Sequence, residues 1–245
     1  MDSFKRSEML VGETGMRMLK SSHVAVFGLG GVGSWAAECL ARAGVGMITI
    51  VDGDCIDVTN INRQLIALRS TIGKNKTDVM AQRIADINPD CEVNSITEFY
   101  RPDNRNLFFR RNYTYIIDAI DTVTSKLDLI ETALSLRIPI ISSLGTGNRL
   151  DCAGFAITDI SKTSGCPLAR VVRRELKKRG ITRHIVLYSP EPPLNPNRRN
   201  SDNSPENSRT PGSVPWIPPV AGFMLAGEVC RRIISNGEPD QSDPI

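Results

Sequence analysis

The sequence predicts an α/β fold, a doubly wound and mostly parallel β-sheet with helices on both faces, and two observations predict it. Short apolar segments of strand type alternate along the 245-residue chain with amphipathic segments of helical period. The first strand segment also runs into a glycine-rich turn and then into a helix, as in a Rossmann-like nucleotide-binding unit. A chain of this length can bury a sizeable core.

The individual elements follow from local periodicity and from turn residues. Strands are expected at 23–27, 47–52, 92–97, 115–120, 138–143 and 154–159. Helices are expected between them at 34–43, 77–88 and 122–136, and a last helix at about 221–234. Residues 190–212 are rich in Pro, Asn, Ser and Arg, which predicts a mobile loop or a lid, and the prolines of 214–220 predict an extended segment.

The glycine-rich turn is the strongest functional signal. It reads Gly28-Leu-Gly30-Gly31-Val-Gly33, and Asp52 ends the next strand 19 residues after Gly33. Gly28 permits the tight turn, Gly30 lets a phosphate approach the backbone, and Gly33 lets the helix pack close to the strand. The helix N-terminus favours a phosphate, and Asp52 is placed to accept hydrogen bonds from a ribose.

A second cluster, rich in polar and basic residues, follows this acid. Asn60, Arg63, Gln64 and then Lys76 supply cations and amides that an attack on the α-phosphate of ATP needs, since charge builds on the phosphate oxygens. A dehydrogenase needs no such cluster, because its redox chemistry belongs to the nicotinamide ring. The alternative interpretation is that Arg63 and Lys76 are solvated loop residues.

Two carboxylates close a third apolar strand, at the end where open α/β sheets bind ligands. Asp121 is expected to hold Mg²⁺ against a triphosphate, since Mg²⁺ favours one or two carboxylates plus phosphate oxygens. Asp121 as a helix N-cap is the alternative, and Asp118 is expected to accept hydrogen bonds from backbone amides.

Charge, apolar runs and cysteine spacing indicate which classes of protein and of metal site the sequence does not favour. The net charge of +3 is mild, no apolar run is long enough to cross a membrane, and no signal-peptide core follows Met1, so a cytoplasmic location is the default expectation. No two of the six cysteines are separated by two residues, so neither a zinc site nor a redox CxxC motif is expected. Most of these thiols are interpreted as small core hydrophobes.

Basic residues are concentrated on one side of a predicted helix, whose other side carries Ala169, Val172 and Leu176. Such a strip is either an ordinary solvated face or the electrostatic footprint of a nucleic-acid backbone. The candidate nucleic-acid contacts are Arg170, Arg173, Arg174, Lys177 and Lys178.

Taken together, these motifs resemble the ThiF-type family, the bacterial relatives of ubiquitin-activating enzymes, and within it the tRNA threonylcarbamoyladenosine dehydratase branch. The resemblance covers roughly residues 4–180 and 211–235, and Trp35-Ala-Ala-Glu38 and the Pro-Pro-Val-Ala-Gly of 218–222 point to the branch. It implies a single ATP-binding domain over 1–245. The implied sites are Gly28, Gly30, Gly31 and Gly33 on the ATP phosphates, Asp52 on the ribose, Asn60, Arg63, Gln64 and Lys76 around the triphosphate, Asp121 on Mg²⁺, and Arg6 reaching the ATP phosphates of a partner subunit in a homodimer.

The resemblance further implies ATP-dependent adenylation and cyclising dehydration of threonylcarbamoyladenosine in tRNA. The runner-up is adenylation of the C-terminus of a ubiquitin-like sulfur carrier, with a carrier or cysteine-desulfurase-type protein as partner; an NAD-dependent oxidoreductase and a non-catalytic tRNA-binding module are more distant. Some dehydratases of the branch carry a cysteine that residues 183–191 lack here. Cys166, expected before a helix, is the candidate substitute, with a packed small residue as the alternative.

Overall fold

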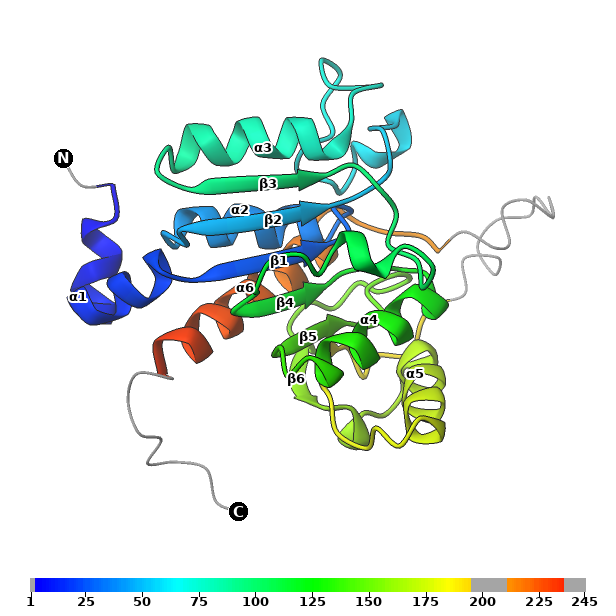
Figure 1. Cartoon of the computed structure of the whole chain (residues 1–245). Helices are drawn as coiled ribbons and strands as arrows, with labels where there is room; N and C mark the ends of the chain where they lie inside the picture. The colour runs from blue at the N-terminus through cyan, green and yellow to red at the C-terminus, as the bar shows by residue number, and fades with distance from the viewer. Residues whose placement is uncertain (1–2, 195–210, 236–245) are drawn as a thin grey trace.

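A seven-stranded sheet forms the centre of the computed structural model, which describes residues 3–194 and 211–235 (Figure 1). The strand order is β3-β2-β1-β4-β5-β7-β6, and every neighbouring pair is parallel except β6 and β7. The predicted doubly wound, mostly parallel sheet is therefore confirmed. The strands are β1 (His23–Phe27), β2 (Met47–Val51), β3 (Glu92–Ile96), β4 (Tyr115–Asp118), β5 (Ile140–Ser143), β6 (Ala156–Asp159) and β7 (Ile185–Tyr188).

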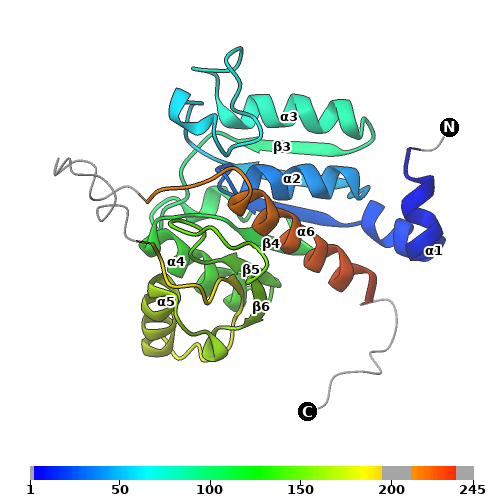
Figure 2. The same ribbon diagram turned by 180° about the vertical axis from the view of Figure 1, so that it is seen from behind.

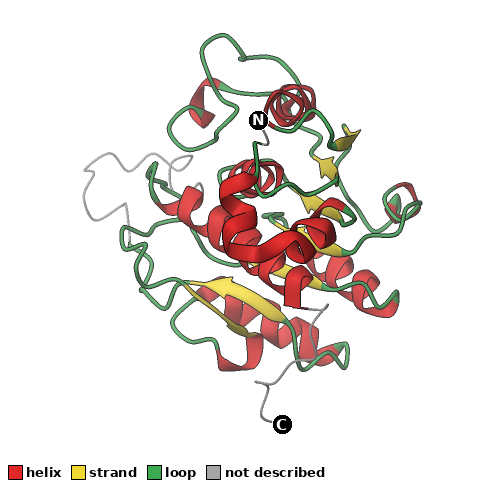
Figure 3. Ribbon diagram, turned by 90° about the vertical axis from the view of Figure 1, so that its left-hand side faces the viewer, coloured by secondary structure: helices red, strands yellow, loops and turns green. Residues whose placement is uncertain are grey.

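Helices cover both faces of this sheet, as the edge view of Figure 3 shows. On one face α2 and α6 lie against the strands beside α3, and Figure 2 shows α6 crossing this face. The other face is covered by α4, α5 and the connection between β3 and β4. The helices are α1 (Lys5–Lys20), α2 (Gly33–Arg42), α3 (Lys76–Ile87), α4 (Val123–Ser135), α5 (Pro167–Lys178) and α6 (Ile217–Ser235).

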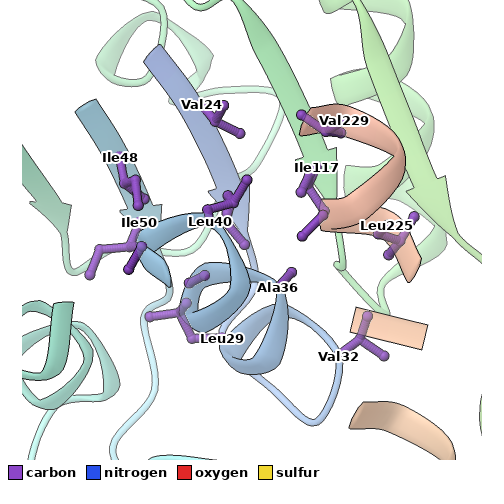
Figure 4. Packing of buried hydrophobic residues seen from close by; sticks show 14 of the residues in the cluster. Val24, Leu29, Val32, Ala36, Leu40, Ile48, Ile50, Ile117, Leu225 and Val229 are labelled. Atoms are coloured by element: carbon purple, nitrogen blue, oxygen red, sulfur yellow. The ribbon is translucent and has the colours of Figure 1, made fainter. Parts of the chain in front are cut away.

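The strands are apolar on both sides because both sides are covered. In β1, Val24 and Val26 face α2 and α6, whereas Ala25 and Phe27 belong to the cluster under α4 and α5. Figure 4 shows Val24 in the first cluster with residues of β2, β4, α2 and α6. Because β1 packs into both cores, its position in the sheet is fixed, and so is the position of the turn that follows it.

The point at which the strand order reverses lies beside β1. From β1 the chain moves outward through β2 and β3, and it then returns to place β4 on the other side of β1. In open α/β sheets a ligand binds outside the carboxyl ends of the strands at this reversal. The carboxyl ends of β1, β2 and β4 carry the glycine turn, Asp52 and Asp118 to Asp121.

Some details differ from the sequence prediction. The last helix begins at Ile217 instead of about 221, so the prediction of an extended segment over 214–220 is wrong for 217–220. The reason is that proline is tolerated in a first helical turn, and Pro218 packs there against Gly31. Strand β7 was not predicted, and it lies between β5 and β6. Most of the loop predicted at 190–212 falls on 195–210, outside the described residues. In the part of the chain that the structure describes, no helix is both long and apolar enough to span a bilayer.

Candidate active site

A cavity of about 1440 Å³ opens at the carboxyl ends of the strands. Its wall combines residues from the glycine turn, from the loops after β2, β4 and β5, and from the start of α5. The structure thus brings together most of the predicted ATP-site residues. The cavity wall includes Gly28, Gly30, Gly31, Asp52, Asn60, Arg63, Gln64, Lys76 and Asp121.

Two of the predicted steric demands on the glycine turn, at Gly28 and Gly33, are confirmed. Gly28 has a φ of +89°, and a Cβ on it would lie 2.8 Å from the carbonyl oxygen of Ala119. A Cβ on Gly33 would lie 1.7 Å from the Gly28 carbonyl oxygen, so only glycine lets α2 start so close to the turn. A Cβ on Gly30 would meet only the Gln64 side chain, at 4.0 Å, which leaves open space for a phosphate.

Asp52 and Lys76 form a buried charge cluster beside this turn. The Leu29 amide donates to Asp52 Oδ2 (2.6 Å) and the Asp54 amide to Oδ1 (2.8 Å), so the carboxylate ties the glycine turn to the end of β2. Lys76 is 4 % exposed, and its Nζ lies 2.8 Å from Asp54 Oδ2 and 3.6 Å from Asp52 Oδ1. Lys76 is therefore not a solvated loop residue: its cation is fixed at the cavity wall.

Hydrogen bonds hold the segment that follows the short helix η1 (Val58–Asn60). The Trp35 indole donates to the Arg63 carbonyl oxygen (3.1 Å), and Arg63 Nη1 donates to the Thr59 carbonyl oxygen (2.9 Å). Gln64 is buried, and its Oε1 has no hydrogen-bond partner. A buried acceptor without a partner is destabilising, and a ligand that brings a hydrogen-bond donor would satisfy it.

The two carboxylates after β4 have different surroundings. Asp118 is fully buried, accepts from the Ile120 amide (3.0 Å) and forms an ion pair of 2.6 Å with Lys126 Nζ. Asp121 is exposed at the cavity, and the hydrogen bond recorded for its side chain comes from Thr122 Oγ1 at 3.3 Å. The N-cap of α4 is Thr122, without a side-chain cap bond, so the capping interpretation of Asp121 is wrong. Asp121 instead lines the cavity.

Sequence reasoning missed a buried polar group behind Asp118. Lys126 has no exposed surface, and its charge lies near His184, whose Nε2 is 2.8 Å from Ser142 Oγ. The signal was a lysine inside the apolar stretch of a predicted helix, next to Leu127. Arg149 in the cavity wall was also missed, although it follows a predicted strand at the ligand-binding edge.

Comparison with known proteins decides the family: the family model described as "ThiF family" matches residues 4–244. The chain belongs to the ThiF family. It is 44 % identical over 243 residues to the tRNA threonylcarbamoyladenosine dehydratase of Bacillus subtilis, covering 96 % of each chain. It is also similar to the crystal structures of Escherichia coli tRNA N6-threonylcarbamoyladenosine dehydratase with ATP and with AMP, each with a TM-score of 0.86, 34 % identity, and coverage of 96 % of this chain and 94 % of that one.

The predicted basic strip lies on α5. The N-terminal residues of this helix, Cys166, Pro167 and Leu168, line the cavity. The apolar side is buried as predicted. The basic residues are not equivalent, however. Arg173 Nη1 donates to the carbonyl and hydroxyl oxygens of Thr163 (2.8 and 2.6 Å), so Arg173 anchors the helix to its own chain. Exposed cations are presented at Arg170, Arg174, Lys177 and Lys178, of which Arg174 and Lys178 share Glu175.

Arg6 lies on α1, which Figure 1 shows at the end of the sheet opposite the carboxyl ends of the strands. Its side chain is exposed and does not line the cavity of its own chain. The same turn of α1 exposes Met9 (78 %) and Leu10 (89 %). An Arg6 that serves a nucleotide site must therefore serve that of another copy.

Cys166 is a buried N-cap of α5, and its Sγ accepts from the Ala169 amide (3.5 Å). We expect Cys166→Ser to retain most of the turnover, because activation of a carboxylate followed by ring closure needs no enzyme thiol. The measurement is the steady-state rate of AMP formation with modified tRNA. Loss of turnover in a variant that still melts like the wild type would instead indicate a thioester route.

His184 makes stability depend on pH. Burial lowers the pKa of His184 from 6.5 to about 3, and the Lys126 charge acts in the same direction. Below pH 6.5 the imidazole is therefore protonated in the unfolded chain but stays neutral in the folded chain. The free energy of unfolding is highest above pH 6.5 and decreases as the pH falls below that value. We expect the free energy of unfolding to fall by about 2 kcal/mol from pH 7 to pH 5. Urea titrations of wild type and His184→Gln test this, and equal pH slopes would contradict it.

Proposed function

We propose that this protein uses ATP to adenylate the free carboxylate of threonylcarbamoyladenosine in tRNA and then closes that side chain into a ring, with net loss of water. The observation that carries the proposal is the cavity itself. It combines a phosphate-accepting glycine turn with the fixed cation of Lys76, with Arg63 and with the open carboxylate of Asp121. The names of the similar dehydratases supply the substrate.

The chemistry follows in two steps. A carboxylate oxygen attacks the α-phosphorus, the bond to the bridging oxygen breaks, and pyrophosphate leaves with the bonding electrons. The neighbouring urea-type nitrogen then attacks the acyl carbon, loses its proton, and expels AMP. The protein aligns the carboxylate with the phosphate and offsets the charge that builds on the phosphate oxygens.

We propose that Asp121 holds Mg²⁺ in this cavity. Mg²⁺ is typically held by one or two carboxylates together with phosphate oxygens. Asp121 offers an exposed carboxylate, whereas both oxygens of Asp118 are already engaged. When bound, the ion would neutralise charge on the triphosphate.

A homodimer completes the proposal. Met9 and Leu10 are apolar, exposed and next to Arg6 on α1, as expected for a helix that packs against a second copy. The partner's copy of Arg6 would then reach the ATP phosphates. We further propose that residues 1–245 form one ATP-binding domain, that α5 contacts the tRNA, and that the enzyme works in the cytoplasm with its substrate.

Two measurements test the function. Purified protein with ATP, Mg²⁺ and threonylcarbamoyladenosine-bearing tRNA is expected to yield a nucleoside lighter by one water in mass spectrometry. ATP with Mg²⁺ is expected to raise the melting temperature and NAD to leave it unchanged, since a ligand that binds only the folded state stabilises it. Stabilisation by NAD and not by ATP would support an oxidoreductase. Stabilisation by ATP without nucleoside conversion would favour a carrier-protein substrate.

A further inference from the structure

Arg149 carries a buried guanidinium that has no anionic partner among residues 3–194 and 211–235. The side chain is 2 % exposed, and Nη1 is buried without a hydrogen-bond partner. Nε lies 3.4 Å from the Gly145 carbonyl oxygen, which is a long and weak contact. Among the described residues no carboxylate lies within ion-pair distance of it, and the nearby Glu191 accepts instead from the amides of Leu150 and Asp151.

The loop that carries Arg149 is rigidly built. It follows β5 and is tied to the end of β7 by the Leu144 amide, which donates to the Leu187 carbonyl oxygen (2.8 Å). Asn148, with a φ of +56°, donates its amide to the Gly212 carbonyl oxygen (2.8 Å) and accepts from the Gly212 amide on Oδ1 (2.6 Å). The guanidinium is therefore positioned by its backbone and not by a counter-ion.

An unpaired buried cation is destabilising, because its lost hydration is not replaced. Such a group is expected where a ligand brings the missing charge. Arg149 lines the same cavity as the glycine turn and Asp121. Its fork of donors matches a carboxylate, with which arginine forms two parallel hydrogen bonds.

The order of the strands separates this cation from the triphosphate site. The glycine turn follows β1, Asp121 follows β4, and Arg149 follows β5, and these three strands are neighbours in that order. Lys76 and Arg63 lie on the β1 and β2 side, so the triphosphate has its own cations. Arg149 lies in the same cavity on the far side of Asp121 from these cations, which leaves it available to a second reactant.

We propose that Arg149 binds the carboxylate of the substrate and presents it to the α-phosphate of ATP. This inference rests on the proposed function and names the residue that selects its substrate group. Bringing a carboxylate onto a triphosphate places like charges close together, and the guanidinium offsets that repulsion. One carboxylate oxygen then forms the bond to phosphorus while pyrophosphate leaves, and the guanidinium keeps its protons throughout.

Arg149→Met removes the cation, and Arg149→Lys keeps the charge without the fork. The matched control is Arg17→Met on α1, an exposed arginine at the opposite end of the sheet. We expect Arg149→Met to lower kcat/KM for modified tRNA by roughly 100-fold, and Arg149→Lys to restore part of it. ATP stabilisation is expected to be unchanged. The melting temperature of Arg149→Met is expected to stay level or rise, whereas a structural arginine would lower it.

A binding measurement with the isolated nucleoside separates recognition of the substrate carboxylate from general affinity for tRNA. The wild type, with a non-hydrolysable ATP analogue, is expected to bind the nucleoside threonylcarbamoyladenosine more tightly than its uncharged methyl ester, and Arg149→Met is expected to bind both equally. Retained discrimination, or a melting temperature that falls with activity, overturns the role of Arg149.

The same experiment keeps the two proposals apart. Wild-type conversion of modified tRNA with full activity in Arg149→Met leaves the function standing and overturns the Arg149 inference. A wild type that ignores modified tRNA, but binds a peptide ending in a Gly-Gly carboxylate only when Arg149 is present, overturns the tRNA substrate and supports the carboxylate site. Failure of both measurements overturns both.

Discussion

Asp121→Ala is expected to reduce turnover by at least about 100-fold while the protein stays folded. The carboxylate is exposed at the cavity, and the contact recorded for it is a 3.3 Å hydrogen bond from Thr122. Substitution at such a site changes stability by no more than about 0.5 kcal/mol. A loss of that size in a folded variant would therefore support the proposed Mg²⁺ role and not a role of Asp121 in the scaffold.

The measurement is pyrophosphate exchange and AMP formation as a function of Mg²⁺ concentration. Asp90→Ala is the matched control, because Asp90 is exposed at the opposite end of the sheet, where it pairs with Lys20. The wild type and the control are expected to saturate with Mg²⁺, whereas Asp121→Ala stays near background at every concentration. An Asp121→Ala enzyme with the wild-type Mg²⁺ profile would refute the metal role.

Removing cations from α5 is expected to weaken tRNA binding strongly, and the difference in affinity from the wild type is expected to be largest at low salt. Arg170, Arg174 and Lys177 are exposed on the side of the helix that faces away from the core, so a triple substitution by Ala leaves Val172 and Leu176 packed. Each lost phosphate contact is expected to reduce the slope of log K against log salt by about 0.9. The triple variant should therefore lose two to three units of slope, about one for each cation.

The control must lose the same charge elsewhere. Substituting Arg17, Lys20 and Arg110 by Ala removes three exposed cations that lie outside α5. Filter binding at several salt concentrations is expected to show a steep slope for the wild type and this control, and a shallow one for the α5 variant. ATP stabilisation is expected to be the same in all three. Equal slopes would make α5 an ordinary solvated face.

The nucleotide half of the fold could be predicted because its signals are local. The apolar run of β1, the three glycine positions and Asp52 lie within a short stretch, and each has one simple steric or electrostatic reason. Strand β7 carried no comparable signal. It is four residues long, and it becomes a strand only through β5 and β6, which are distant in sequence.

The site was predicted less completely for a similar reason. Asp118 and Asp121 were given different roles from the sequence, but the ion pair that buries Asp118 against Lys126 was not predicted, because it depends on the packing of α4 against β4. Arg173 looked like its neighbours on α5 until Thr163 was found beneath it. Arg149 belongs to no periodic pattern, and its meaning depends on the absence of an anion among the described residues around it.

The position of α6 has a consequence for how the protein is made. Ile217, Leu225 and Val229 complete the same core as β1 and β2, yet Ile217 follows Val51 by 166 residues. At translation rates of about 5–20 residues per second, roughly 8–30 s pass in which α2 and α3 can cover this face but α6 cannot. This interval is long enough for a chaperone to engage the nascent chain. The glycine turn thus leaves the ribosome well before α6 completes the core beside it.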